Sequence, residues 1–179
     1  MAKLTKNEEY IVDMYVRYFG KAPSDAKIAE YNKFGKPKLI LKEIIGDADD
    51  SKAGLTTEEF VNNAFQNLFG RNATTKEMNK YSKVVDKGND LPINSIVKSA
   101  AKTDKDVNKN KLEVAAKYEQ LGGKGDLDLS KISKGNTVDL KTVVTLTDLT
   151  NAIDKLADNS GIPSSFDGKA FVLTTGADN

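Results

Sequence analysis

Two acidic stretches of the chain have the residue types and spacing that could bind calcium. Side-chain oxygens alternate along both, and Glu58 is the twelfth residue counted from Asp47, where a helix-loop-helix site needs a bidentate carboxylate. That motif requires glycine at its sixth position, which is Lys52 in the first stretch and Lys109 in the second. Neither stretch is therefore a complete EF-hand, and turns or helix caps are the alternative interpretation. The candidate ligands are Asp47, Asp49, Asp50, Glu58, Asp104, Asp106 and Asn108.

Composition limits the other chemistry that is possible. The 179 residues include no His and no Cys, and the formal net charge is +1. Without these two residue types a Ser/His triad, a zinc site of the usual kind and a disulfide cannot form. The low net charge gives no global attraction to nucleic acid, and no apolar run approaches the roughly 20 residues of a spanning helix. We therefore expect a protein that is not an enzyme, with no nucleic-acid partner and no transmembrane segment.

Part of the first half of the chain repeats after fifty positions. Apolar residues fall at helical spacing from Tyr10 to Phe19 and again from Phe60 to Phe69, which predicts one amphipathic helix in each copy. We expect these aromatic side chains to form core and not a ligand platform. Setting residues 8–33 over 58–83 gives the identical pairs Glu8/Glu58, Glu9/Glu59, Phe19/Phe69, Gly20/Gly70, Tyr31/Tyr81 and Lys33/Lys83.

Sequence signals mark where these helices begin and end. A Ser or Thr can cap a helix start, most strongly with Glu three residues later, and a glycine can adopt the left-handed conformation that ends a helix. The expected N-caps are Thr5, Ser24, Thr56 and Thr74, and the expected terminating glycines are Gly20 and Gly70. A third short helix is predicted in each copy, over residues 39–45 and 93–101, so that each copy forms a three-helix unit.

The second half of the chain is expected to add further helices. Residues 107–121 predict a helix that ends at Gly122, and residues 147–157 predict another. Residues 138–146 are strand-like in composition but could be helical. Residues 169–179 indicate the start of a strand after a turn-rich segment.

Two passages resemble sequences of exported bacterial proteins. Residues 19–24 and 69–74, Phe-Gly-Lys-Ala-Pro-Ser and Phe-Gly-Arg-Asn-Ala-Thr, are each followed by an aromatic residue, Tyr31 and Tyr81, and look like a helical repeat of such proteins. Residues 171–179, Phe-Val-Leu-Thr-Thr-Gly-Ala-Asp-Asn, resemble the opening of a glycine- and aspartate-rich, calcium-binding β-solenoid. Together they resemble the N-terminal anchoring domain of Gram-negative surface-layer (S-layer) proteins of the RTX-like, type I secreted kind.

This resemblance implies a fold, a partner and a location. The fold would be mainly all-α, with two repeated three-helix units and further C-terminal helices, ending in the first strand of a truncated β-solenoid that continues beyond Asn179. The expected domains are a duplicated anchoring region over 5–110, completing helices over 111–160 and the start of a β-rich domain over 161–179. The function would be non-covalent attachment of an extracellular S-layer protein to lipopolysaccharide, through its O-antigen or core glycan.

Four cations on expected loops are the candidate glycan-binding residues, because sugar phosphates and acidic groups attract Lys and Arg. They are Lys21, Lys36, Lys38 and Arg71. A solvated surface charge is the alternative for each. Neighbouring S-layer subunits would be further partners, and calcium the possible cofactor. Two alternative functions remain open: a protein–protein assembly module, and an accessory domain of an exported RTX-type adhesin or toxin.

Overall fold

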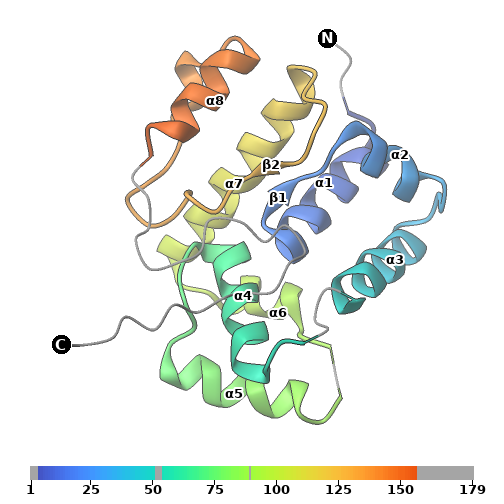
Figure 1. Cartoon of the computed structure of the whole chain (residues 1–179), viewed down its shortest axis with the longest axis vertical. Coiled ribbons are helices and arrows are strands. Elements are labelled where there is room, and N and C mark those ends of the chain that lie inside the picture. The colour runs from blue at the N-terminus through green and yellow to red at the C-terminus, as the bar shows by residue number, and fades with distance from the viewer. Residues whose placement is uncertain (1–3, 51–53, 89, 157–179) are drawn as a thin grey trace.

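The computed structural model describes residues 4–50, 54–88 and 90–156, which form a mainly helical fold (Figure 1). The two short strands pair in antiparallel register, with Ala22 opposite Leu127. No helix of the described residues is long and apolar enough to cross a membrane. The elements are α1 (Lys6–Phe19), β1 (Lys21–Ala22), α2 (Asp25–Asn32), α3 (Pro37–Asp50), α4 (Thr57–Phe69), α5 (Thr75–Val85), α6 (Ile93–Ser99), α7 (Lys102–Gln120), β2 (Leu127–Asp128), the 3-10 helix η1 (Leu140–Thr142) and α8 (Leu146–Asp154).

The predicted helix boundaries at the caps are confirmed. Thr5, Thr56 and Thr74 each accept a hydrogen bond from the backbone of a Glu three residues on, whose carboxylate in turn accepts one from the capping residue. Ser24 caps α2 by accepting a bond from the backbone of Lys27. Gly20 and Gly70 adopt the left-handed conformation, and their N–H groups close the last turns of α1 and α4. These local signals are sufficient because each satisfies backbone groups that a helix end leaves without partners.

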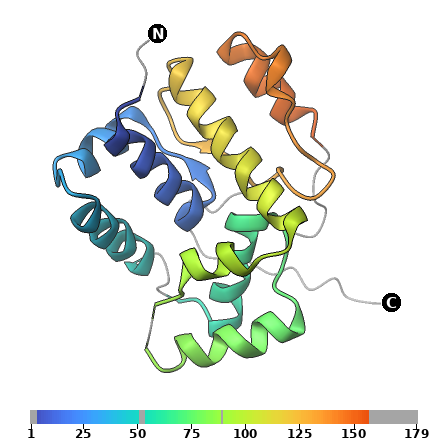
Figure 2. The same cartoon turned by 180° about the vertical axis from the view of Figure 1, so that it is seen from behind.

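Helix α7 runs through the middle of the molecule, with α1–α3 on one side, α8 on the other and α4–α6 at one end (Figures 1 and 2). Its buried residues Val107, Val114 and Ala115 belong to the larger core, which they share with α1, α2, α3 and α8. A second core lies among α4, α5 and α6. Tyr18 packs against both, and so links them. The aromatic stripes of α1 and α4 mostly face inward, as expected.

Lys111 of α7 is fully buried and caps the C-terminal end of α4. Its ammonium Nζ donates to the carbonyl oxygens of Gln66 (2.8 Å) and Asn67 (2.9 Å). One turn earlier on α7, Asn108 donates to the carbonyl of Leu68 (3.5 Å). The last turn of a helix has unpaired carbonyls and a partial negative charge, so a buried cation there is favourably placed. Burial nevertheless lowers the pKa of Lys111 to about 7, although the carboxylate of Asp128 opposes that shift.

Two of the predicted helices are longer than expected. The helix predicted over 39–45 is α3, which continues to Asp50 because Ile40, Ile44 and Ala48 place buried side chains on one face beyond Gly46. The helix predicted over 107–121 begins at Lys102, so Asp104, Asp106 and Asn108 are helical and not in a loop. Gly46 in α3 and the polar residues at the start of α7 were the misleading signals. Both segments are helical because each buries an apolar face against the rest of the protein.

The remaining expectations for the second half are met in part. Residues 138–146 form neither a strand nor a continuous helix but contain η1, with Val138 and Val143 buried on either side of it. The helix predicted over 147–157 is α8. A boundary at residue 110 would divide α7, and residues on both sides of it share the larger core. Residues 161–179, with the predicted strand and linker, lie outside the described residues.

We predict that Gly70→Ala destabilises the protein more than Gly35→Ala. Both glycines have positive φ, +63° and +67°, so a side chain costs about 1–2 kcal/mol at either. A Cβ at Gly70 would also lie 2.4 Å from the carbonyl oxygen of Ile132, whereas one at Gly35 would meet nothing within 4 Å. Urea unfolding of the two variants measures the difference, and equal losses would contradict the packing argument.

We also predict that Lys111 makes stability rise with pH in the alkaline range. Between its folded pKa of about 7 and its ordinary value of 10.5, the unfolded chain binds the proton that the folded chain releases, so raising the pH favours folding. From pH 7.5 to 9.5 this contributes about 2 kcal/mol to the free energy of unfolding. Urea titrations of the wild type and Lys111→Met at both pH values test it. A variant that keeps the full pH dependence would show that another group causes it.

Candidate functional site

Asp126 fixes the backbone around the candidate site. The β1–β2 pairing brings the loop before β2 to the start of α2. There Asp126 Oδ1 accepts a hydrogen bond from the Ser24 N–H (2.9 Å), and Oδ2 accepts one from the Tyr15 hydroxyl (3.0 Å). Burial, and then the Asp126 charge, raise the pKa of Tyr15 above its ordinary value, so the hydroxyl keeps its proton. One carboxylate thus connects α1, the start of α2 and the loop after α7.

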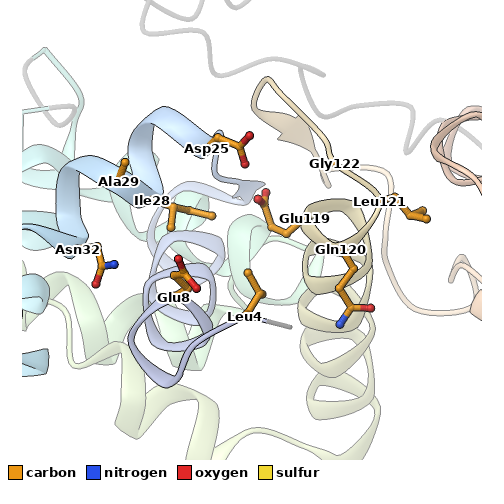
Figure 3. Close-up of a pocket in the computed structure, with 10 residues that line it drawn as sticks. All are labelled: Leu4, Glu8, Asp25, Ile28, Ala29, Asn32, Glu119, Gln120, Leu121 and Gly122. Atoms are coloured by element: carbon orange, nitrogen blue, oxygen red, sulfur yellow. The ribbon is translucent and has the colours of Figure 1, made fainter. Parts of the chain in front are cut away.

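A pocket of about 620 Å³ opens between α1, α2 and the end of α7 (Figure 3). It combines apolar surface with carboxyl groups and amides, and no Lys or Arg is among its lining residues. Its potential is therefore negative. Leu4, Ile28, Ala29 and Leu121 supply the apolar surface, Glu8, Asp25 and Glu119 the carboxyl groups, and Asn32 and Gln120 the amides.

The carboxyl groups of Glu119 and Asp25 form a pair at the upper edge of this pocket. Glu119 extends from the last turn of α7 toward the start of α2, where Asp25 is the first helical residue (Figure 3). Burial raises the pKa of Glu119 to about 8, with further contributions from the charge of Asp25 and a hydrogen bond with it. Two carboxyl groups can share a hydrogen bond only when one is protonated.

The protonation of this pair affects the hydrogen bonding of the Glu119 carboxyl group. Its Oε1 is buried and has no hydrogen-bond partner among the described residues. Near neutral pH the pair therefore holds one proton, and it needs a donor from outside to become fully ionised. A hydroxyl or an ammonium group in the pocket could supply that donor.

The pocket's chemistry favours a neutral or amine-bearing ligand with several hydroxyl groups. Carboxylate oxygens accept hydrogen bonds from hydroxyls, amides both donate and accept, and the Leu4 and Ile28 side chains can contact the C–H face of a sugar ring. A phosphate or carboxylate ligand would be repelled by the charges of Glu8 and Asp25. The pocket thus differs from the set of basic residues that the sequence suggested.

The four predicted glycan-binding cations do not come together. Lys21 lies in β1, where it has interactions within the chain, and Lys36 and Lys38 lie at the turn into α3. Arg71 follows α4, at a separate place in the fold. None of the four lines the pocket.

All five N–H groups of Arg71 are used within the chain. Its guanidinium makes two hydrogen bonds each to Glu77 and Asp104, at 2.6–3.1 Å, and one to the Asn72 carbonyl. It also lies 5.3 Å from the centre of the Phe65 ring. The paired guanidinium lowers the pKa of Glu77 to about 2. Arg71 therefore joins the start of α5 to the start of α7 and has no donor left for a glycan.

The predicted calcium ligands are also spread over helices. Asp47, Asp49 and Asp50 lie in the last turns of α3, where Asp47 accepts a hydrogen bond from the Tyr31 hydroxyl (2.6 Å) and Asp49 has interactions within the chain. Glu58 is in the first turn of α4. Within the described parts of the chain, no three acidic residues are grouped so that they could hold a metal ion.

The second predicted calcium stretch has a structural role in α7. Asp104 binds Arg71, Asp106 pairs with Lys102 (2.7 Å), and Asn108 is buried against α4. A predicted metal ligand and a predicted glycan ligand, Asp104 and Arg71, are thus partners of each other. The loop geometry on which the calcium prediction depended is wrong here, because all three residues are helical.

Sequence reasoning missed the residues that line the pocket. Asp25 follows an expected N-cap, and Glu119 lies in an expected helix, but they are more than ninety positions apart. Only the β1–β2 pairing and the packing of α7 on α1 bring them together. The one local signal was the short Gly-rich segment after α7, which turns tightly around Tyr118, where the Gly125 carbonyl accepts from the Tyr118 hydroxyl (2.8 Å).

Comparisons with known proteins leave the family open. No family model matches the chain, and no curated protein or solved structure is significantly similar to it.

We predict that the Glu119–Asp25 pair makes stability fall as the pH rises from 5 to 8. The folded pKa of Glu119 lies above its ordinary value of 4.5, so the folded chain binds more protons in this range, and that stabilisation is lost on deprotonation near pH 8. Glu119→Gln should flatten this fall in melting temperature. Glu113→Gln, a change at an exposed position of the same helix, is the control and should behave as the wild type. An unaltered pH profile in Glu119→Gln would refute the assignment.

Proposed function

We propose that this chain is a non-catalytic attachment module that binds the lipopolysaccharide glycan of a Gram-negative cell and so holds an extracellular S-layer protein to the surface. The observation that carries the proposal is the pocket of carboxyl groups, amides and apolar side chains between α1, α2 and α7. Its ligand would be a neutral or amine-bearing sugar of the O-antigen or core, and not a phosphate group. This assignment replaces Lys21, Lys36, Lys38 and Arg71 as the glycan-binding residues.

The geometry of the carboxyl pair supports binding over hydrolysis. Glycosidases hold their two carboxyl groups about 5–10 Å apart, so that a sugar and in some cases a water can lie between them. Asp25 and Glu119 instead lie close together at one edge of the pocket, and part of the raised pKa of Glu119 comes from its interaction with Asp25 (Figure 3). The pair can accept hydrogen bonds from a bound sugar but cannot act from opposite sides of it.

The proposal also treats α1–α3 and α4–α6 as duplicated units of an anchor. In support, the two segments have the same helix order, the same Thr and Glu capping pairs at their first helices and the same left-handed glycines after them. The second unit has a different role from the first: the C-terminal end of its helix α4 is capped by Lys111 of α7, whereas the first unit lines the pocket together with the end of α7. Calcium would then act, if it does, outside the pocket.

A membrane-binding assay of matched variants tests the proposal. The chain should bind membranes with lipopolysaccharide and not membranes that lack it, and polysaccharide released from its lipid should compete. Asp25→Asn/Glu119→Gln should weaken binding at least tenfold, because two acceptors of hydroxyl protons are replaced. The control is Asp106→Asn/Glu113→Gln, which makes the same two kinds of replacement at exposed positions of α7.

The outcomes separate the glycan role from its alternatives. Equal binding to both kinds of membrane would reject the glycan, and concentration-dependent oligomers without any glycan would favour an assembly module. Equal weakening by the two double variants would move the glycan site away from the pocket. Repeating the assay with calcium and with a chelator decides whether a metal is needed.

A further inference from the structure

Exposed apolar and basic residues are concentrated at the turn between α2 and α3, which we term the lysine corner. Its residues are Lys33, Phe34, Lys36, Lys38, Leu39 and Lys42. Phe34 is 38% exposed and Leu39 46%, and in the described parts of the chain Val144 is the other large apolar residue with such exposure. Every residue from 33 to 39 is exposed. Phe34 and Leu39 are thus exposed apolar side chains within a run of lysines.

The charge of the lysine corner is unbalanced. Residues 33–42 include four lysines and no Asp or Glu. Lys27, Lys102 and Lys109 form ion pairs with acidic neighbours, but the four lysines of the corner form none among the described residues. The net charge of the whole chain is only +1, so this positive potential is local.

The backbone holds Phe34 and Leu39 outward. Gly35 has a φ of +67°, and its carbonyl accepts a hydrogen bond from the Asn7 side chain of α1 (2.8 Å). The N–H of Phe34 donates to the Tyr31 carbonyl (3.1 Å), which continues the end of α2 into the turn. On α3, Ile40 and Ile44 are fully buried, so Leu39 and Lys42 lie on the outward face. The backbone of this turn is therefore held by hydrogen bonds to α1 and α2.

We propose that the lysine corner docks on the surface of an anionic lipid bilayer. Phe34 and Leu39 would enter the region between headgroups and acyl chains, and the four lysines would lie against lipid phosphates with their alkyl stems along the apolar pair. Two apolar side chains alone give weak binding, and so do four lysines alone, but the two contributions combine. Charge complementarity makes the occupant a phosphate-rich membrane and not an apolar partner.

The corresponding turn between α5 and α6 lacks this combination. Lys83 and Lys87 are accompanied by Asp86 and Asp90, and the apolar residues Leu91 and Ile93 are buried. Exposed lysines together with exposed apolar side chains are thus found at residues 33–42 but not at the equivalent turn of the second unit. Asn32, which lines the pocket, directly precedes the corner, so docking would place the pocket opening close to the membrane.

Vesicle co-sedimentation tests the proposal in the absence of any glycan. The wild-type chain should bind vesicles of mixed phosphatidylglycerol and phosphatidylcholine at low salt, lose most of that binding at 0.5 M salt, and leave pure phosphatidylcholine vesicles unbound. Lys33→Gln/Lys36→Gln/Lys38→Gln/Lys42→Gln and Phe34→Ser/Leu39→Ser should each weaken binding at least tenfold. The matched control replaces the exposed Lys76, Lys80, Lys83 and Lys87 by Gln, which changes net charge equally.

Each outcome decides the proposal. Loss in both corner variants with retention in the matched control supports it, and circular dichroism should show all variants folded because every replaced side chain is exposed. It is overturned if the wild type ignores anionic vesicles, if phosphatidylcholine binds as well, or if the control loses as much as the lysine variant. Since the vesicles contain no sugar, failure here is distinct from failure of the glycan assay, which depends on Asp25 and Glu119.

Discussion

The contact on which the rest of the structure depends is the buried ammonium of Lys111. It donates to two carbonyls of α4, whose Asn67 in turn donates through its side-chain amide to the carbonyl of Tyr18 in α1 (2.8 Å). A side chain of α4 thus contacts the last turn of α1, and a side chain of α7 contacts the last turn of α4. A buried lysine is costly to desolvate, and the carbonyl acceptors with the negative helix end offset part of that cost. The packing of α7 on α4 and the packing of α4 on α1 therefore depend on each other.

Local sequence signals were enough to place most helices but not their lengths. Capping boxes at Thr5, Thr56 and Thr74 satisfy backbone groups within three residues, so the sequence alone carries them. The end of α3 and the start of α7 depend on which face becomes buried, and that is decided by other helices. Polar residues such as Asp104 and Asn108 look like loop residues until Arg71 and the Leu68 carbonyl are seen beside them.

The candidate site was harder to predict for a related reason. Cations on expected loops suggested a basic glycan surface. In the structure all the N–H groups of Arg71 form hydrogen bonds within the chain, and the pocket is lined by carboxyl groups, amides and apolar side chains. The pKa of Glu119 is raised because the packing of α7 on α1 buries this side chain and brings it close to Asp25. Neither effect can be read from the sequence around Glu119. Lys36 and Lys38 were correctly placed on the surface, but the exposed Phe34 and Leu39 beside them change the kind of surface they indicate.

The pairing of β1 with β2 has a consequence for how the chain acquires its structure. It joins positions about a hundred residues apart, and the core around α1 is complete only when α7 has packed beside α2 and α3. Long-range closure of this kind slows folding, because loop entropy is lost before the contacts that reward it form. During synthesis the core around α1 would therefore remain incomplete, with part of its apolar surface accessible to chaperones, until the segment ending near Leu129 has emerged from the ribosome.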